Sequence, residues 1–403
     1  MVQTWNLQGK LICGTTDQGS NMKSAMLTYG ATDNIHWIPC ASHRIQLCIN
    51  KGVERTPAAK AIVEKCRSTS TLFRNSSVAM DINNRLQDRM LGKRCKFLTT
   101  NVTRWNSEYD MASRVLLLKD TIRESHNSLV SGSREAKAKG AELGRYLLDE
   151  EEGLALKEII DLLKPIAAFT HWAGSLDRST TSQMYHRVFS LFSELEPPDS
   201  AAAHDLRVQL DNLIQEYFPI KDIPDVVLIA IYLNPACVAL KMLDSLRTAD
   251  GTPLRAKALN LTLAALEKFK EEKARQNAPP PQPQNTQEAS FTIVRGMNSF
   301  QLEALGTLSN YASTIANDPD NFLKYKDSPQ AFWIKMQQER GFQDLADLAR
   351  SYLCIQATSA ESERLFSKAG LILSPLRTRL SDTNFSNLLF ARSFYKLKKL
   401  DII

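Results

Sequence analysis

A long run of helical periodicity constrains the fold of this chain more than any other feature of its sequence. Between about Thr56 and Lys273, apolar residues recur at three- and four-residue spacing, the repeat of helices that turn one face to a core. Few strand signals interrupt this pattern. One stripe comprises Met111, Val115, Leu118 and Ile122, and another comprises Leu154, Ile159, Leu162, Leu163 and Ile166. The sequence therefore predicts a large helical domain, which we place at residues 57–310.

Prolines predict where this helical pattern breaks. Pro165 lies inside the second stripe, where it removes a backbone donor and clashes with the preceding turn, so we expect a kink or an interruption there. Residues 275–290 are rich in proline and glutamine and lack apolar periodicity, which predicts a solvated loop. Helices resume beyond this loop, and residues 311–403 are predicted to form a third region.

The N-terminal residues have a different pattern, in which strands alternate with helices. A short strand is predicted at residues 11–13, and Ser20 and Asn21 can cap the helix that follows it. A second strand is expected at residues 35–38, with another helix after Pro39. This alternation is typical of an α/β sheet covered by helices. We therefore expect an α/β fold with a large all-α insertion, in which residues 1–56 supply part of the sheet.

Composition argues against several classes of protein. The N-terminus has no basic segment followed by apolar residues, and the longest apolar run, residues 226–233, is too short to cross a bilayer, so we expect no membrane contact. The seven cysteines are scattered without a Cys-x-x-Cys pair, which favours free thiols in the nucleus or cytosol. The formal charge of +6 permits contact with nucleic acid, but no dense basic block supports it.

Two carboxylates stand where a site could form. Asp17 follows the first predicted strand, at the sheet end where α/β proteins build their sites, although a turn that caps a helix is the simpler interpretation. Thr358 and Glu361 have the spacing of a capping box, which predicts a helix beginning near Thr358. Glu363 then falls on the face expected to point to the core, where a carboxylate needs a cation, a donor or a metal. The alternative is a partly exposed Glu363 paired with Arg364 or a lysine.

Several short motifs carry a resemblance to a known family. The segment Ala357-Thr358-Ser359-Ala360-Glu361-Ser362-Glu363-Arg364-Leu365-Phe366-Ser367, with Leu348–Leu353 before it and Arg377–Leu380 and Asn387–Phe390 after it, resembles the C-terminal dimerisation region of the hAT (hobo/Ac/Tam3) transposases. Five upstream motifs are similar to elements of that family: TDQGSNM at 16–22, CASHRIQL at 40–47, TRWNS at 103–107, LLKP at 162–165 and LNP at 233–235. Because these motifs also occur in the family's order, the chain is identified as resembling a hAT protein.

The resemblance implies an RNase H-like fold interrupted by a helical domain, with an Asp-Asp-Glu triad that holds two divalent metals for DNA cleavage. Asp17 matches the second acid and Glu363 the third, and these two would be the metal ligands if any metal binds. No Asp or Glu occurs in residues 1–16, so we expect the first acid and any BED zinc finger to be missing through N-terminal truncation. We therefore expect an incomplete RNase H-like fold. We expect no bound cofactor in this chain, and Mg or Mn only in a catalytic full-length form.

Contacts with DNA are a further implication of the resemblance. Trp105 matches a tryptophan thought to stack on an extruded base, and Arg104 beside it could touch phosphate. The simpler interpretation of Trp105 is a core residue of a helical bundle. His43 is expected to orient the active-site region. Cys40 and His43 could supply two ligands of a zinc site, but no second pair of ligands lies at a suitable spacing.

Self-association is the activity that the resemblance implies most directly. The leading hypothesis is a nuclear, catalytically silent homodimer with no small-molecule substrate. The alternatives are a fragment of an active, metal-dependent DNA transposase and a non-catalytic, DNA-binding regulator. Interface and core share the same apolar character, so the residues predicted for dimerisation could equally serve the core. These residues are Phe332, Trp333, Leu345, Leu348, Leu353, Phe366, Leu388, Leu389 and Phe390.

Overall fold

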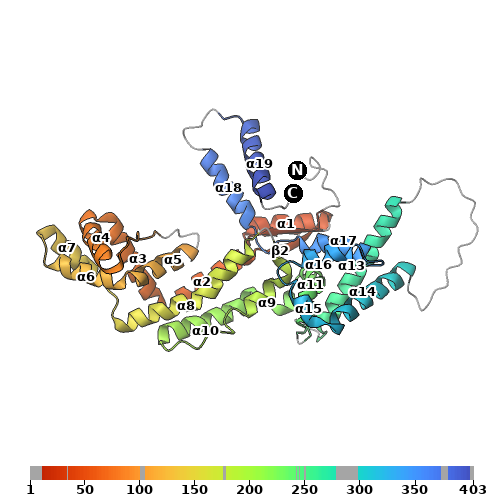
Figure 1. Cartoon of the computed structure of the whole chain (residues 1–403), viewed down its shortest axis with the longest axis horizontal. Helices are drawn as coiled ribbons and strands as arrows, with labels where there is room; N and C mark the ends of the chain where they lie inside the picture. Colours follow the sequence, from red (N-terminus) through yellow and green to blue (C-terminus); the bar gives the residue numbers. More distant parts are fainter. Residues whose placement is uncertain are drawn as a thin grey trace, which may run out of the picture. The chain divides into compact units, whose positions relative to one another are not determined.

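The fold is mostly helical (Figure 1), and the described residues include one sheet of two parallel strands. The structure, a computed structural model, describes residues 11–33, 35–99, 105–175, 178–241, 243–244, 246–248, 251–277, 298–373 and 380–399. No helix in these ranges is both long enough and apolar enough to cross a membrane. Two compact units are present. The sheet unit comprises Met1–His43, Trp172–His186 and Pro219–Ile403, and the helical unit comprises Arg44–His171 and Arg187–Phe218.

Strand, helix, strand and helix follow one another at the start of the sheet unit, as the sequence predicts. They are β1 (Cys13–Thr16), α1 (Ser20–Asp33), β2 (His36–Pro39) and α2 (Ala41–Glu54), the last of which continues into the helical unit. The strands pair in parallel, with Cys13 opposite His36 and Thr16 opposite Pro39. A parallel pair needs a crossover connection, which α1 supplies. The first strand was predicted too close to the N-terminus. Its pairing begins at Cys13, which is the last residue of the predicted strand.

The helical unit confirms the apolar stripes of the sequence. Met111, Val115, Leu118 and Ile122 are all buried, whereas Leu154 is exposed at the edge of the second stripe. Pro165 does not interrupt its helix, which runs from Glu150 to Ala173; buried Leu162, Leu163 and Ile166 anchor the helix on both sides of the proline. The elements are α3 (Pro57–Asn75), α4 (Ser77–Leu91), α5 (Trp105–Leu117), α6 (Lys119–Val130), α7 (Arg134–Gly144), α8 (Glu150–Ala173), α9 (Met184–Phe189), which begins in the sheet unit, and α10 (Ala201–Tyr217).

The sheet unit has its core around α11 (Asp225–Tyr232), whose residues from Val226 to Tyr232 are all buried. A helix that is apolar on every side needs cover on every side. The cover comes from α13 (Leu254–Asn277), α17 (Gln343–Leu353) and the short helix η1 (Thr181–Gln183). The helices from 219 to 310 therefore pack in the sheet unit, which differs from the single helical domain expected at 57–310.

Aromatic side chains close this core. The Trp333 indole N–H donates to the carbonyl of Leu233 at 2.7 Å, and the Tyr311 hydroxyl donates to the carbonyl of Tyr232 at 3.1 Å. The remaining elements are η2 (Ile220–Asp222), α12 (Pro235–Ala239), α14 (Ser299–Asn317), α15 (Pro319–Leu323), α16 (Pro329–Met336), α18 (Ala360–Ile372) and α19 (Asp382–Lys399). Helix α13 extends to Asn277 and so includes the first three residues of the predicted Pro/Gln-rich loop. The rest of that loop, from residue 278, lies outside the described residues.

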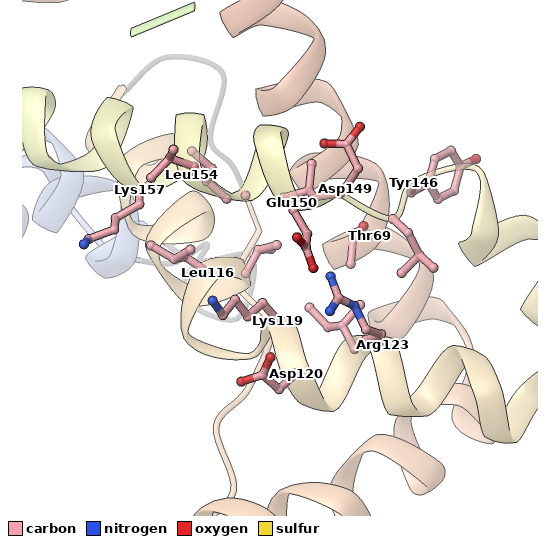
Figure 2. A pocket seen from close by; sticks show the side chains of 16 residues that line it. Thr69, Leu116, Lys119, Asp120, Arg123, Tyr146, Asp149, Glu150, Leu154 and Lys157 are labelled. Atoms are coloured by element: carbon pink, nitrogen blue, oxygen red, sulfur yellow. The ribbon is translucent and has the colours of Figure 1, made fainter. Parts of the chain in front are cut away.

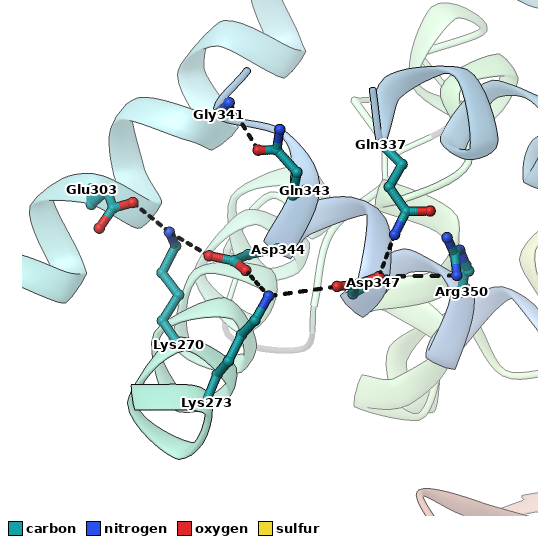
Figure 3. Close-up of polar contacts among 9 residues, drawn as sticks. All are labelled: Lys270, Lys273, Glu303, Gln337, Gly341, Gln343, Asp344, Asp347 and Arg350. Atoms are coloured by element: carbon teal, nitrogen blue, oxygen red, sulfur yellow. Dashed lines mark hydrogen bonds and ion pairs between the residues drawn. The ribbon is translucent and has the colours of Figure 1, made fainter. Parts of the chain in front are cut away.

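Ion pairs join α13, α14 and α17 (Figure 3). The Lys270 ammonium lies 2.6 Å from a Glu303 carboxylate oxygen and 3.1 Å from Asp344, and the Lys273 ammonium lies 2.7 Å from the other Asp344 oxygen. Only 7% of the Lys270 side chain is exposed. Burial alone would raise the pKa of Asp344, but hydrogen bonds from Lys273 and Lys270 lower it below its usual value. The network therefore holds three helices together through charges that stay ionised.

Candidate functional site

The candidate site lies at the carboxyl end of the two-stranded sheet, where residues 356–359 meet the N-terminal elements. The Thr15 hydroxyl donates to the carbonyl of Gln356 at 2.8 Å, and the N–H of Ala41 donates to the carbonyl of Ala357 at 2.9 Å. The N–H of Ser359 donates to Cys40 Sγ at 3.4 Å. The family-like segment is thereby attached to β1 and to the start of α2.

The same segment is held from a second direction by buried polar groups. The Thr180 hydroxyl donates to Gln356 Oε1 at 3.0 Å and accepts from the N–H of Ala357 at 2.9 Å. The Thr358 hydroxyl donates to the carbonyl of Ala173 at 3.2 Å. Buried polar groups are costly unless they are paired, so these bonds fix the segment in one arrangement.

The predicted capping box does not form. Helix α18 begins at Ala360, and its N-cap is Ser359, whose side chain makes no capping bond. Thr358 is buried, and its hydroxyl donates to the carbonyl of Ala173 and accepts from the N–H of Ala360 at 3.4 Å, so it makes one bond to the start of the helix but no reciprocal bond with Glu361 is present among the described residues. Glu361 is hydrogen-bonded to Arg364, which also donates to the carbonyl of Gly174 at 2.6 Å. The requirements of the buried segment therefore outweigh the local capping preference.

Asp17 and Glu363 are attached to the same end of the sheet. Asp17 follows β1, and the carbonyl of the preceding Thr16 accepts from the N–H of Cys40 at 2.7 Å. Cys40 in turn contacts Ser359, whose hydroxyl lies 3.4 Å from Glu363 Oε1. The order of elements predicted from the sequence therefore brings the segments of both acids to one region.

The surroundings of the two acids are open. Asp17 is exposed, and its Oδ1 accepts from the N–H of Gly19 at 3.1 Å. This is the hydrogen bond of an Asx turn, in which an aspartate side chain bonds the backbone two residues later. Glu363 is also exposed, so the prediction that it points to the core was wrong. The reason is that α18 buries only Ala369 and Ile372 in the described structure, near its far end.

A pair of divalent metals does not fit the side chains in this region. A two-metal centre needs several clustered ligands. Within the described ranges, no group of three or more His, Cys, Asp or Glu side chains is placed to hold a metal ion. Asp17 and Glu363 alone are insufficient, so we derive no catalytic step through a metal.

The structure describes two of the three residues expected to contact DNA, Trp105 in the helical unit and His43 in the sheet unit. Trp105 begins α5 with only 4% of its surface exposed and meets Tyr109 edge-on, with ring centroids 6.2 Å apart. It lines a cavity of about 280 Å³ together with Glu54, Glu64 and Glu108, among others. Lys60 and Arg67 line the same cavity, so its walls carry both charges, and Arg67 is paired with Glu108. Arg104 lies outside the described residues, and His43 is half-buried in the first turn of α2.

The residues predicted for dimerisation separate into two groups. Phe332, Trp333, Leu345, Leu348 and Leu353 are buried in the core of the sheet unit, where a partner cannot reach them. On α18 and α19, Phe366, Leu388 and Phe390 are exposed, and Leu389 is half-buried. Sequence reasoning missed Leu371, Leu373, Phe394 and Tyr395, which are exposed on or beside the same helices. The four-residue spacing of Phe390 and Phe394 could have indicated Phe394.

A comparison with protein families gives one match. Residues 308–395 match the model of the hAT family C-terminal dimerisation region. A comparison with curated proteins gives no match. The matched residues begin in α14 and end in α19. The match shows that this segment is similar to a dimerisation region of the hAT family, which supports a capacity for self-association.

Proposed function

We propose that this chain, which carries a hAT family C-terminal dimerisation region, is a hAT-derived protein that forms a homodimer through α18 and α19. The observation that carries the proposal is a set of exposed, large apolar side chains, which we call the α18–α19 surface. Its members are Leu365, Phe366, Leu371, Leu373, Leu388, Phe390, Phe394 and Tyr395.

The exposure of this surface is costly in water. Phe366 is 74% exposed and Phe390 is 66% exposed, and the rings of Phe390 and Phe394 stack with centroids 6.2 Å apart. Covering a side chain of this size stabilises a protein by about 1.5–3 kcal/mol. Clusters of large exposed apolar side chains often mark protein interfaces. The α18–α19 surface comes from two helices that contact each other, which favours an interface there.

A second copy of this chain is the occupant that the observations favour. The surface lies at the end of the segment that matches a dimerisation region. In a two-fold dimer the same patch serves both copies, so an apolar surface can cover itself without any other partner. Helix α16, also in the matched segment, exposes less apolar surface. Its Ile334 is 59% exposed, but the neighbouring Phe332 and Trp333 are buried.

We further propose that the chain alone does not cleave DNA. Support comes from the exposed Glu363, from Asp17 engaged in its own turn, and from the lack of a third metal-binding side chain near them in the described structure. An RNase H-like fold, nuclear localisation and contact with DNA rest on the family resemblance. A plasmid-nicking assay with Mg²⁺ or Mn²⁺ tests the first point, since nicking abolished by Asp17→Asn would contradict it.

Sedimentation of the purified chain tests the dimer. We expect a dimer in the wild type and a monomer in the Phe366→Asp/Phe390→Asp variant. Ile334→Asp is the matched control, because it places the same charge on another exposed apolar position of the matched region. A wild-type monomer at micromolar concentration would contradict the proposal.

A further inference from the structure

The helical unit contains a cleft that the proposed dimer does not use (Figure 2). Its volume is about 330 Å³, within the usual range of small-molecule sites. The walls come from the end of α5, the start of α6, residues 146–149 and the start of α8. Thr69 on α3 completes the lining, so five segments of the chain enclose one space.

The floor of this cleft is apolar. Val115, Ile122 and Leu156 are buried beneath it, and Leu116 and Leu148 line it with half-buried side chains. Such a floor favours an aliphatic or aromatic group over water. A ligand that fills the cleft should therefore have a large apolar part.

The mouth carries opposite charges on opposite walls. Lys119 and Arg123 are four residues apart on α6 and so share one face of that helix. Across the mouth stands Glu150, at the start of α8, and Figure 2 shows its carboxylate facing the Arg123 guanidinium. Among the residues that the structure describes, neither Arg123 nor Glu150 has an ion-pair partner. The mouth thus presents an unpaired cation opposite an unpaired anion.

The charges of the whole lining balance. The cations are Lys119, Arg123 and Lys157, and the anions are Asp120, Asp149 and Glu150. Asp149 is already engaged, since its Oδ1 accepts from the N–H of Glu152 at 2.8 Å. A purely anionic ligand would meet Glu150, a purely cationic one would meet Arg123, and a neutral one would leave both unpaired. Only a ligand with both charges matches both walls.

We propose that this cleft binds a zwitterionic α-amino acid with a large apolar side chain. The ligand carboxylate contacts Arg123 and Lys119, and its ammonium contacts Glu150. Its side chain packs on Leu116, Leu148 and the buried residues beneath them. No step of dimerisation depends on this site.

Calorimetric titration of the full chain with L-leucine and L-phenylalanine tests the proposal. We expect saturable binding at one site per chain. N-acetyl-L-leucine lacks the ammonium and L-leucinamide lacks the carboxylate, so each should bind at least about tenfold more weakly than leucine. Absence of saturable binding in the millimolar range, or equal affinity for all three leucine compounds, would overturn the proposal.

Substitutions inside the cleft locate the binding. Gly153 lines the cleft, and an added Cβ there meets no atom within 4 Å, so Gly153→Leu should fill the space without straining α8 and abolish binding. Gly306 on α14 is equally unobstructed, so Gly306→Leu is the control and should bind as the wild type does. Retained leucine binding in Gly153→Leu would place the ligand elsewhere and reject the site.

Charge substitutions provide a second test that does not depend on the filled variant folding. Arg123→Gln and Glu150→Gln should each weaken leucine binding by about tenfold or more. Lys137→Gln on α7 removes an exposed cation outside the cleft and should leave the affinity unchanged. Circular dichroism confirms the helical content of each variant. Affinities equal to that of the wild type in both cleft variants would overturn the proposal.

Discussion

The Thr15 hydroxyl donates a hydrogen bond to the carbonyl of Gln356 at 2.8 Å, across 341 positions of the chain. This bond ties β1 to the segment that begins the family-like motif. Thr15→Val keeps the shape of the side chain but removes the donor, so we expect local opening of residues 356–359 to become easier by about 1 kcal/mol. Hydrogen exchange of the Ala357 and Ser359 amides measures this change, and Thr15→Ser should restore most of the protection. Unchanged protection in Thr15→Val would show that the bond contributes nothing.

Thr180 should be more sensitive than Thr15, because it is fully buried. Thr180→Val leaves both Gln356 Oε1 and the Ala357 N–H without their partner, which should cost about 1–3 kcal/mol. Thermal unfolding followed by circular dichroism measures this loss. Thr314→Val is the matched control, since Thr314 is exposed and its hydroxyl donates to the carbonyl of Asn310 in the preceding turn. Equal destabilisation by both substitutions would contradict this account of residues 356–359.

Acid should weaken the connection between α13 and α17. The pKa of Asp344 is below its usual value of 3.8, so its stabilising effect is complete above that value and is lost as the pH falls through the lowered pKa. Asp344→Asn should lower the free energy of unfolding by about 1 kcal/mol at neutral pH. The loss is modest because water screens the pair with Lys273, whose side chain is 44% exposed. The difference in unfolding free energy between wild type and variant, measured from pH 7 to pH 3, should shrink towards acid. A constant difference would contradict the ion-pair assignment.

Lys270 gives the opposite dependence on pH. Burial alone would lower its pKa, but hydrogen bonds from its ammonium to Glu303 and Asp344 raise it above the usual 10.5. Its stabilising effect is therefore complete below that value and is lost as the pH rises through the raised pKa. Lys270→Met should flatten the alkaline end of the stability profile, measured by urea unfolding between pH 9 and pH 11. A profile identical to that of the wild type would contradict this prediction.

Thiol reactivity should follow burial. Burial raises the pKa of the Cys66 thiol to about 12, and the side chain is inaccessible on α3. Because the thiolate is the nucleophile, iodoacetamide at pH 8 should leave Cys66 unmodified in the folded chain. Cys354 is exposed and should react earlier, although partial burial raises its pKa as well. Peptide mapping by mass spectrometry gives the order, and modification of Cys66 as fast as Cys354 would contradict the packing of α3.

Local pattern was sufficient for the elements of the fold. The alternation around β1 and β2 identified both strands, because it is a pattern of neighbouring residues. Ser20 and Asn21 were expected to cap α1, but the helix begins at Ser20 itself, whose hydroxyl donates to Asn21 Oδ1 at 3.1 Å. The stripe containing Met111 and Val115 identified a buried helix face for the same reason. Seven free thiols were also expected, and all seven lie unpaired in the described structure.

Orientation was harder to predict, because it depends on distant contacts. Glu363 was expected on a core-facing side, yet the rotation of α18 is set by bonds from Ser359 to Cys40 and from Arg364 to Gly174. The sequence gives no sign that these positions meet. Apolar character alone also could not separate buried Trp333 from exposed Phe366, since core and interface use the same residue types.

Sedimentation equilibrium across a micromolar concentration range tests the central claim most directly. The wild-type chain and the Ile334→Asp control should both fit a dimer, whereas Phe366→Asp/Phe390→Asp should fit a monomer with unchanged helical content. Burying a charge in a covered apolar interface explains this expected loss. A dimer in the double variant, or a monomer in the Ile334→Asp control, would show that α18 and α19 do not form the interface.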